Sequence, residues 1–209
     1  MSKKLNVSAT RMELMKLRKR LSTASRGHKL LKDKLDELMR QFLRMIKGYK
    51  DLHREVEEEI LKAHRHFVFA RAMMSPIDIE EALMFNPEKY LSVDLSWQNI
   101  MSVRIPEMKV QGEVHSGQYG YAKTSADIDL AMSHYKQALP KLLELAAKRQ
   151  SLELLADEIE STRRRVNALE YVLIPSIEET IHDIIMRMNE LERSNLTRLM
   201  RVKEIVRQH

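Results

Sequence analysis

The side chains best suited to chemistry are histidines and clustered carboxylates, but their spacing argues against a reactive site. His64 and His66 stand two residues apart, so on a helix their rings point to different faces rather than around one metal ion. We expect both to lie on a solvated face. Glutamates cluster within 55–59 and again at 178–179, yet acid–base chemistry needs a pocket that shifts a carboxyl pKa. We expect these carboxylates to lie on solvated helix faces.

Three further motifs also argue against a reactive site. His28 falls in an apolar seam, where a polar residue that fixes the register of two helices is expected. Arg163 to Arg165 are rotated by about 100° from one residue to the next on a helix, so they cannot all face one ligand. Residues 25–29 include a glycine but lack the spacing of a phosphate-binding loop. The sequence therefore predicts no catalytic, cofactor-binding or metal-binding residue.

The composition indicates long helices that share a thin core. Charged residues make up 32% of the 209 residues and aromatic residues 5%, with five glycines and five prolines. The absence of cysteine excludes disulfides and thiolate metal sites. The first residues lack the apolar core of a signal peptide, and no stretch approaches the ~20 apolar residues of a membrane span. We expect a soluble protein with no direct membrane insertion.

The first long helix is predicted to begin at Thr10, because Glu13 three residues later completes a capping box. Its end is expected at Ser75, because the residue before a proline is disfavoured in a helix and Pro76 follows. Between these points the apolar positions alternate in steps of three and four, which is the heptad signature of a coiled coil. The seam positions are Leu14, Leu17, Leu21, Ala24, His28, Leu31, Leu35, Leu38, Phe42, Met45, Tyr49, Leu52 and Val56.

A second heptad helix occupies the last third of the chain. Its seam begins with Leu152, Leu155, Ile159, Thr162, Val166, Leu169 and Leu173. Past Leu173 a strict heptad would bury polar residues, whereas a shift by one residue restores an apolar seam. The shifted positions are Ile177, Ile181, Ile184, Met188, Leu191, Asn195 and Val202. Pro175 lies inside this step, so the sequence predicts a local irregularity of the helix there.

The middle of the chain has a different pattern. A short helix is expected within 79–90, a strand at 91–95 and a second strand at 100–105 that Pro106 closes. Glycines at 112, 117 and 120 then indicate a loop that carries Tyr119 and Tyr121. Helix resumes near Ser125, with Asp127 and Asp129 in its first turn, where the helix dipole favours negative charge.

These elements predict a mostly α fold. Two long heptad helices flank a compact insertion, so we expect an antiparallel two-helix coiled coil with a small β-hairpin-containing knob at the end opposite the termini. The predicted domains are an N-terminal helix over 1–75, the knob over 76–125 and a C-terminal helix over 126–209. The competing arrangement is a parallel homodimer, in which each helix pairs with its copy in a second chain.

Charge is distributed unevenly along the sequence. Residues 1–50 carry 15 Lys or Arg against 4 Asp or Glu, whereas residues 51–162 carry 12 against 19. A basic end can favour nucleic acid or orient the chain in an acidic protein socket. The cations wrap around the predicted helix and no aromatic stacking platform accompanies them. We therefore favour a protein-binding rod over nucleic-acid binding, which stays an alternative together with a coiled-coil scaffold or adaptor.

Four sequence blocks resemble one known family. The blocks are NVSATRMELMKLRKRL at 6–21, ASRGHKLLKDKLDELMRQF at 24–42, RRRVNALEYVLIPSIEETI at 163–181 and the shorter NIMSVRIPEM at 99–108. They strongly resemble the D subunit of the rotary V-type and A-type ATPases, over both long helices and part of the knob. A small departure is Ser8 and Ala9, where that family commonly has Asn-Pro.

The resemblance implies a central rotor shaft without catalytic activity. In that family, the D subunit is an antiparallel coiled coil whose termini enter a hexamer of alternating A and B subunits, with one copy for three A and three B. Its lower part binds the small F subunit of the stalk and the funnel-shaped subunit above the membrane ring. The resemblance further implies a peripheral place on the cytoplasmic face of a membrane complex, coupling ATP hydrolysis or synthesis to ion translocation.

Position and charge then suggest which residues meet those partners. The cations expected to contact the A/B headpiece are Arg11, Lys16, Lys19, Arg20, Arg26, Arg187, Arg198, Arg201 and Lys203. The carboxylates expected to contact the F subunit are Glu55, Glu57, Glu58, Glu153, Asp157 and Glu158. Both sets are hypotheses about surfaces.

Overall fold

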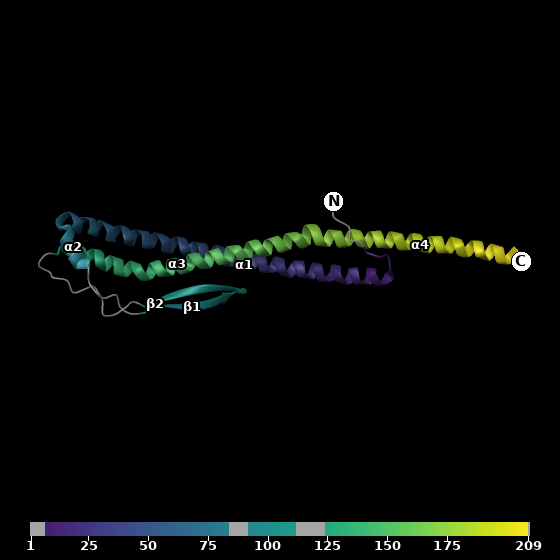
Figure 1. The fold of residues 1–209 in the computed structure, drawn as a ribbon, viewed down its shortest axis with the longest axis horizontal. Coiled ribbons are helices and arrows are strands. Elements are labelled where there is room, and N and C mark those ends of the chain that lie inside the picture. The colour runs from purple at the N-terminus through teal and green to yellow at the C-terminus, as the bar shows by residue number, and fades with distance from the viewer. Residues whose placement is uncertain (1–6, 84–91, 112–123, 209) are drawn as a thin grey trace. The chain divides into compact units, whose positions relative to one another are not determined.

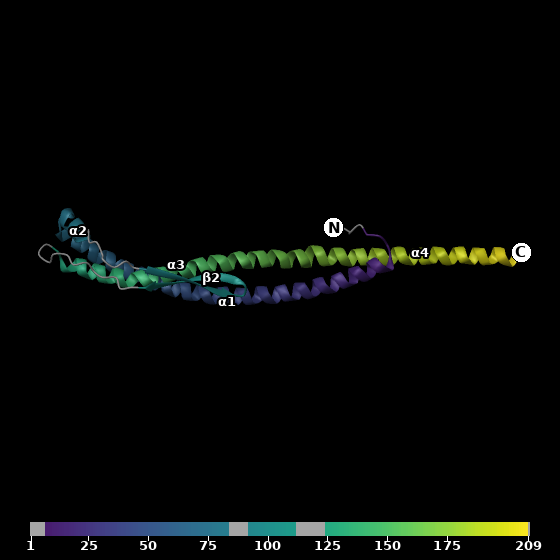
Figure 2. The same cartoon turned by 60° about the horizontal axis from the view of Figure 1, so that its bottom comes forward.

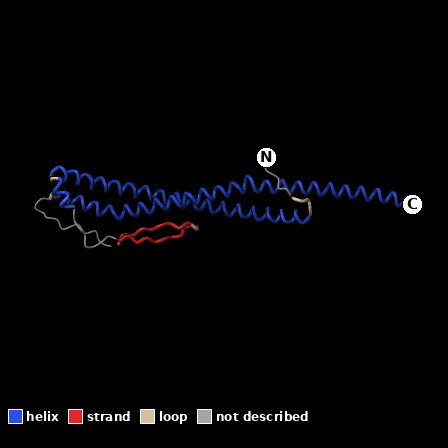
Figure 3. Tube along the Cα trace, in the orientation of Figure 1, coloured by secondary structure: helices blue, strands red, loops and turns tan. Residues whose placement is uncertain are grey.

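The computed structural model describes residues 7–83, 92–111 and 124–208. Its elements are α1 (Arg11–Met73), α2 (Pro76–Leu83), β1 (Ser92–Ile100), β2 (Val103–Gln111), α3 (Ala126–Asn167), the π-helical turn η1 (Ala168–Leu173) and α4 (Ile174–Gln208) (Figure 1). The described chain is mainly helical, and its strands lie in one hairpin (Figure 3). Two compact units are present: a terminal unit of Met1–Glu37 with Ile159–His209, and a central unit of Leu38–Glu158.

The start and end of α1 follow the predicted signals. The Glu13 backbone N–H donates to Thr10 Oγ1 at 3.3 Å, which satisfies one of the free donors at the helix start. The helix ends at Met73, and Pro76 opens α2, where a missing N–H has no cost. All thirteen predicted seam positions of α1 are buried or half-buried, which confirms the heptad assignment.

In the central unit, α1 and α3 pair in an antiparallel arrangement. Glu55 on α1 meets Lys141, Glu59 meets His134 at 3.2 Å, and His66 meets Asp127. The partner numbers fall along α3 as the α1 numbers rise, so the two helices run in opposite directions. Figures 1 and 2 show the helices side by side in this unit.

The end of this pairing is closed by small and medium apolar residues. Ala70 and Ile128 are buried together, and Met74 packs against them. The Ser125 hydroxyl accepts the Asp127 backbone N–H at 3.3 Å, so Ser125 caps α3, and the helix begins where it was predicted to resume.

The terminal unit has the same antiparallel pairing. Arg11 Nη2 lies 3.0 Å from Glu192 Oε1, and His28 Nε2 lies 3.4 Å from Glu170 Oε2. The core cluster consists of Leu17, Ile177 and Ile184. His28 is therefore a half-buried polar seam residue with a cross-helix partner, as predicted. The long helices find their partners within the chain.

The predicted irregularity is the π turn η1. The Ile174 backbone N–H donates to the Leu169 carbonyl, five residues earlier instead of four, so the turn holds one extra residue. This extra residue produces the one-residue shift of the seam, and Ile177 is fully buried after it. Pro175 supplies a cause, because its ring would clash with the Tyr171 carbonyl of a regular α turn and it has no N–H to donate.

The seam prediction fails in the last part of α4. Ile177, Ile181, Ile184 and Met188 are buried or half-buried, but Leu191 is 56% exposed, Asn195 is exposed and Val202 is 55% exposed. The reason is length: α1 begins at Arg11, which already meets Glu192. Beyond this level none of the described residues covers α4.

The prediction of two strands was correct, but the predicted ranges of 91–95 and 100–105 were wrong in extent. β1 continues to Ile100, and Met101 and Ser102 form a two-residue turn with positive φ of 51° and 76°. β2 then passes through Pro106 to Gln111 instead of ending there. Proline is tolerated because its missing N–H points away from β1. Hydrophobic runs alone did not reveal a turn made of Met and Ser, which are unusual at positive φ.

The other predictions for the middle are tested only in part. The short helix is α2, which starts at Pro76 and is described to Leu83, three residues before the predicted start. The rest of the range predicted for this helix, and Leu91, lie outside the described residues. The glycine-punctuated loop with Tyr119 and Tyr121 lies outside them as well.

Candidate interaction surfaces

The predicted headpiece cations all lie in the terminal unit, on exposed positions of two helices. Arg11 pairs with Glu192, Lys16 with Glu13 at 2.6 Å, and Arg187 with Asp183 at 2.9 Å. These pairs are surface pairs, so each contributes at most about 1 kcal/mol to folding. Their side chains therefore stay accessible to a partner at little energetic cost.

The remaining α1 cations lie farther from the helix start. Lys19, Arg20 and Arg26 are exposed, and Arg26 Nε donates to the Ser22 carbonyl at 3.3 Å. They occupy more than one face of α1, as their spacing in the sequence implies. The structure therefore does not bring them into one compact patch.

The last part of α4, residues 193–208, combines positive charge with apolar surface. Arg198 and Arg201 line a shallow groove of about 330 Å³ on this helix, beside Arg193 and Thr197. Large apolar side chains are exposed around it: Leu191, Leu196, Leu199, Met200, Val202, Ile205 and Val206. Contiguous exposed apolar surface of this kind is uncommon in monomeric soluble proteins. Sequence reasoning singled out only the cations, although the apolar residues at 199, 200, 202, 205 and 206 do not fit a single seam.

The carboxylates predicted to contact the F subunit lie in the central unit at two separate levels. Glu55 pairs with Lys141 on α3, whereas Glu153 lies twelve residues farther along α3, about 18 Å away along the axis. Glu57 contacts His53, and Glu153 contacts Arg149 at 3.2 Å. The other predicted carboxylates are Glu58 and Asp157, both exposed, and Glu158, which is half-buried. The acids on α1 and α3 are thus not brought together.

His64 and His66 of α1 both contact α3: His64 is exposed as expected, whereas His66 is half-buried, which corrects the expectation of a solvated face for that residue. His64 Nδ1 contacts the Tyr135 hydroxyl, and His66 Nδ1 lies 3.2 Å from Asp127 Oδ1. The rings of His66 and His134 stack with centroids 5.7 Å apart. Antiparallel packing of α3 supplies these partners, and no pattern within α1 alone indicates them.

Neighbouring groups and burial shift the pKa values of two side chains in this contact between α1 and α3. A hydrogen bond from His134 and a second one from Lys62 hold the pKa of the Glu59 carboxyl below its ordinary value. Burial raises the pKa of the Tyr135 phenol. Among the described residues, no group of three or more His, Asp or Glu side chains is arranged to hold a metal ion.

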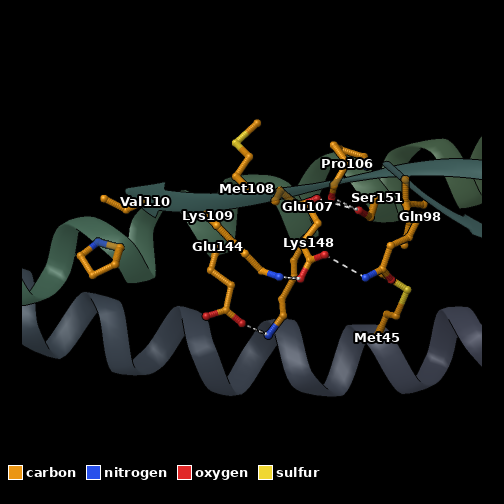
Figure 4. Close-up of a pocket in the computed structure, with 13 residues that line it drawn as sticks. Met45, Gln98, Pro106, Glu107, Met108, Lys109, Val110, Glu144, Lys148 and Ser151 are labelled. Atoms are coloured by element: carbon orange, nitrogen blue, oxygen red, sulfur yellow. Dashed lines mark hydrogen bonds and ion pairs between the residues drawn. The ribbon is translucent and has the colours of Figure 1, made fainter. Parts of the chain in front are cut away.

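A groove of about 590 Å³ lies between β2 and the helices of the central unit (Figure 4). Lys109 lies 3.3 Å from Glu107, whose pKa it lowers by a hydrogen bond, and Lys148 lies 2.7 Å from Glu144. The charged side chains that line the groove are therefore neutralised in pairs. Two uncharged polar side chains of the groove also have partners: Ser151 Oγ donates to the Ala147 carbonyl at 2.7 Å, and Gln98 Nε2 donates to Glu107 at 2.8 Å.

No helix in the described part of the chain is long and apolar enough to cross a membrane.

Comparison with known proteins identifies the family. A family model described as the D subunit of ATP synthase matches residues 13–204. The chain is 53% identical to the V-type ATP synthase D subunit of Clostridium novyi (strain NT) over 97% of this chain and 96% of that protein. It is 53% identical to the D subunit of Clostridium botulinum (strain Langeland), with the same coverage, and 52% identical to that of Acetivibrio thermocellus, over 97% of this chain and 92% of the relative. The chain therefore belongs to the D-subunit family of ATP synthases, whose members are central stalk subunits of the rotary V-type ATPases.

Proposed function

We propose that this chain is the rotating axle of a V-type complex, a subunit without catalytic residues of its own. The observation that carries the proposal is the uncovered end of α4, where residues 195–207 are all exposed. A single helix with this much apolar surface is not stable or soluble by itself, so it needs surrounding protein. The central cavity of an A/B hexamer would supply that surrounding.

The partners follow from this position. The terminal unit would contact the A and B subunits, with one axle for three A and three B. The central unit would carry the small F subunit and stand on the funnel-shaped subunit above the membrane ring. Exposed carboxylates on both helices of the central unit support a charged contact there. The chain would then be a peripheral part of the complex at the cytoplasmic face of the membrane.

Transmission of torque fits the helix pairing. Cross-helix contacts such as Arg11 with Glu192 and Glu55 with Lys141 fix how one helix lies against the other in each unit. Two paired helices resist twisting better than one. The π turn changes the phase of one helix only, so the surfaces before and after Leu173 differ. Unequal faces would allow the axle to present a different surface to each catalytic A/B pair.

The decisive experiment is native mass measurement of the chain alone and after mixing with the A/B headpiece from the same source. We expect one copy to bind three A and three B subunits, since only a central position gives that ratio. A stable homodimer that ignores the headpiece would contradict the proposal and favour a coiled-coil scaffold.

A further inference from the structure

The hairpin has one covered edge and one open edge. The sheet contains only β1 and β2 among the described residues, so the outer edge of β1 pairs with none of them. Every residue from Ser92 to Asn99 is exposed. Only another extended strand can satisfy a row of outward N–H and C=O groups in ladder geometry.

The turn determines which residues face the open edge. Ile100 and Val103 flank the two-residue turn and form a hydrogen-bonded pair, after which hydrogen-bonded and non-hydrogen-bonded pairs alternate. The β1 residues in non-hydrogen-bonded pairs direct their backbone groups outward. These residues are Val93, Leu95, Trp97 and Asn99. Pro106 lies opposite Trp97 in such a pair, which agrees with its lack of an N–H.

The outer edge of β2 is covered by α3 and blocked in part. The outward carbonyl of Pro106 accepts the Ser151 hydroxyl at 3.5 Å, and Ile105 and Pro106 are buried (Figure 4). Proline also removes one outward donor. The edge of β2 therefore has both a covering element and a residue that disfavours strand addition.

The edge of β1 has no such protection. Its sequence contains no proline and no lysine, and its register with β2 runs without a bulge from Ser92 to Ile100. Its one charged side chain, Asp94, already accepts a hydrogen bond from Gln111. A two-stranded hairpin is marginally stable, and a third strand would stabilise it.

The side chains indicate what an added strand would carry. Val93, Leu95 and Trp97 share one face of the hairpin and are 44%, 51% and 60% exposed. The opposite face is polar at Ser96 and Gln98, which both hydrogen-bond to Glu107. A strand that alternates apolar and polar side chains would place its apolar set beside Trp97.

We propose that the open edge of β1, from Val93 to Asn99, is a strand-addition site for an extended segment of another subunit of the same complex. The partner contributes backbone hydrogen bonds to Val93, Leu95, Trp97 and Asn99 and apolar side chains on the Trp97 face. The choice of partner rests on the proposed axle role, since it assumes that the chain is assembled with other subunits.

The test measures amide hydrogen exchange in the isolated chain and in the complete complex purified through this chain. In the complex, the outward amides of Val93, Leu95, Trp97 and Asn99, which have no ladder partner in the isolated chain, should exchange about tenfold more slowly or better, a larger gain than that of the inward amides of Asp94, Ser96 and Gln98, which are already paired with β2. Unchanged exchange of the outward amides would overturn the proposal.

Two variants at one position separate backbone pairing from apolar contact. Leu95→Pro removes an outward donor without removing a bond to β2, so Val93 and Trp97 should lose their added protection. Leu95→Thr keeps the N–H and the strand propensity, so protection should persist. Equal loss in both variants would mean that a partner packs on the apolar face, which would contradict strand addition. Retained protection of Asp94 and Ser96 verifies that the hairpin of Leu95→Pro is folded.

Two controls identify the occupant. Outward amides of the isolated chain that become protected as its concentration rises would identify a second copy as the occupant, and this would overturn the proposal. Trp97 is the only tryptophan, so a change of its fluorescence as the concentration of the isolated chain rises would report the same self-association. Native mass of the wild-type complex tests the axle role separately, because its subunit ratio does not depend on the exchange of four amides.

Discussion

Glu59 illustrates how one residue links the two helices of the central unit. Its carboxylate contacts His134 on α3 at 3.2 Å and Lys62 on α1 at 3.3 Å. Both partners favour the ionised carboxylate, in line with its lowered pKa. The residue therefore couples the stability of this pairing to pH.

We expect Glu59→Gln to lower the melting temperature at neutral pH and to flatten its dependence on pH. Because the pKa of Glu59 is lowered in the folded state, its contribution is present above the ordinary value of about 4.3 and is lost as pH falls through the lowered folded pKa. Thermal unfolding measured from pH 6 to pH 3 checks this. Glu58→Gln, at an exposed position, is the matched control. A constant difference between wild type and Glu59→Gln over this range would contradict the assignment.

Buried and exposed apolar residues of α4 should behave in opposite ways. Ile177 is fully buried in the core cluster with Leu17 and Ile184, so Ile177→Ala should lower the free energy of unfolding by about 2–5 kcal/mol. Leu196 is 58% exposed, so Leu196→Ala should change it by less than about 0.5 kcal/mol. Denaturant unfolding measures both effects.

The Leu196→Ala variant also tests the proposed contact with the headpiece. Leu196→Ala should weaken binding of the isolated chain to the A/B headpiece although its stability is unchanged. If Leu196→Ala binds as tightly as wild type, this side chain lies outside the headpiece contact.

At the scale of elements, the π turn and Pro175 act together. A proline inside a regular helix costs about 3 kcal/mol, but the wider turn before Pro175 removes part of the clash with Tyr171. Pro175→Ala should therefore raise the melting temperature, by an amount that corresponds to less than this full cost. Calorimetry of the isolated chain provides the measurement. A lower melting temperature would mean that packing in the terminal unit requires the proline.

Heptad spacing carried most of the fold because it is a property of neighbouring residues. It placed the thirteen seam residues of α1 and the shift near Leu173, and the capping-box signal placed the N-cap at Thr10. The same reasoning failed at Leu191 and Val202, because burial also needs a partner helix that extends far enough.

The side-chain contacts of the candidate surfaces were less predictable, because they too depend on a second helix. Contacts between His66 and Asp127 or His134 and Glu59 depend on the register of two helices, which spacing within one helix does not determine. The strand register depended on a turn at Met101 and Ser102, and neither residue is a typical turn residue at positive φ. The cations could be identified as candidates from the sequence. The exposed apolar surface among them follows from the structure, because α4 extends beyond the start of α1 and its last part has no partner helix among the described residues.

For the whole molecule, charge reversal tests the headpiece contact. Replacing Arg198, Arg201 and Lys203 by Glu should weaken assembly with the A/B headpiece and reduce hydrolysis that depends on rotation, while thermal stability stays close to that of wild type because all three positions are exposed. Binding at several salt concentrations measures the effect, since contacts between charges weaken with salt. A normal salt response and unchanged coupling would exclude these cations from the interface.

The acidic surface of the central unit has its own test. Neutralising Glu55, Glu57 and Glu58 to Gln in one variant and Glu153 and Asp157 to Gln and Asn in another separates the two levels of the surface. We expect reduced retention of the F subunit in a pull-down from the variant whose level forms the contact. Full retention in both variants would favour apolar packing as the basis of that contact.

The π turn also constrains how members of this family can be recombined. A chimera that joins the first part of this chain to the α4 of a relative keeps its seam when the junction lies before Ala168 or after Ser176, because the extra residue of the turn then comes from one parent. A junction inside 168–176 that duplicates or drops this residue rotates everything that follows by about 100°. The exposed end of α4 would then present other side chains to its surroundings, even though every residue of it is unchanged.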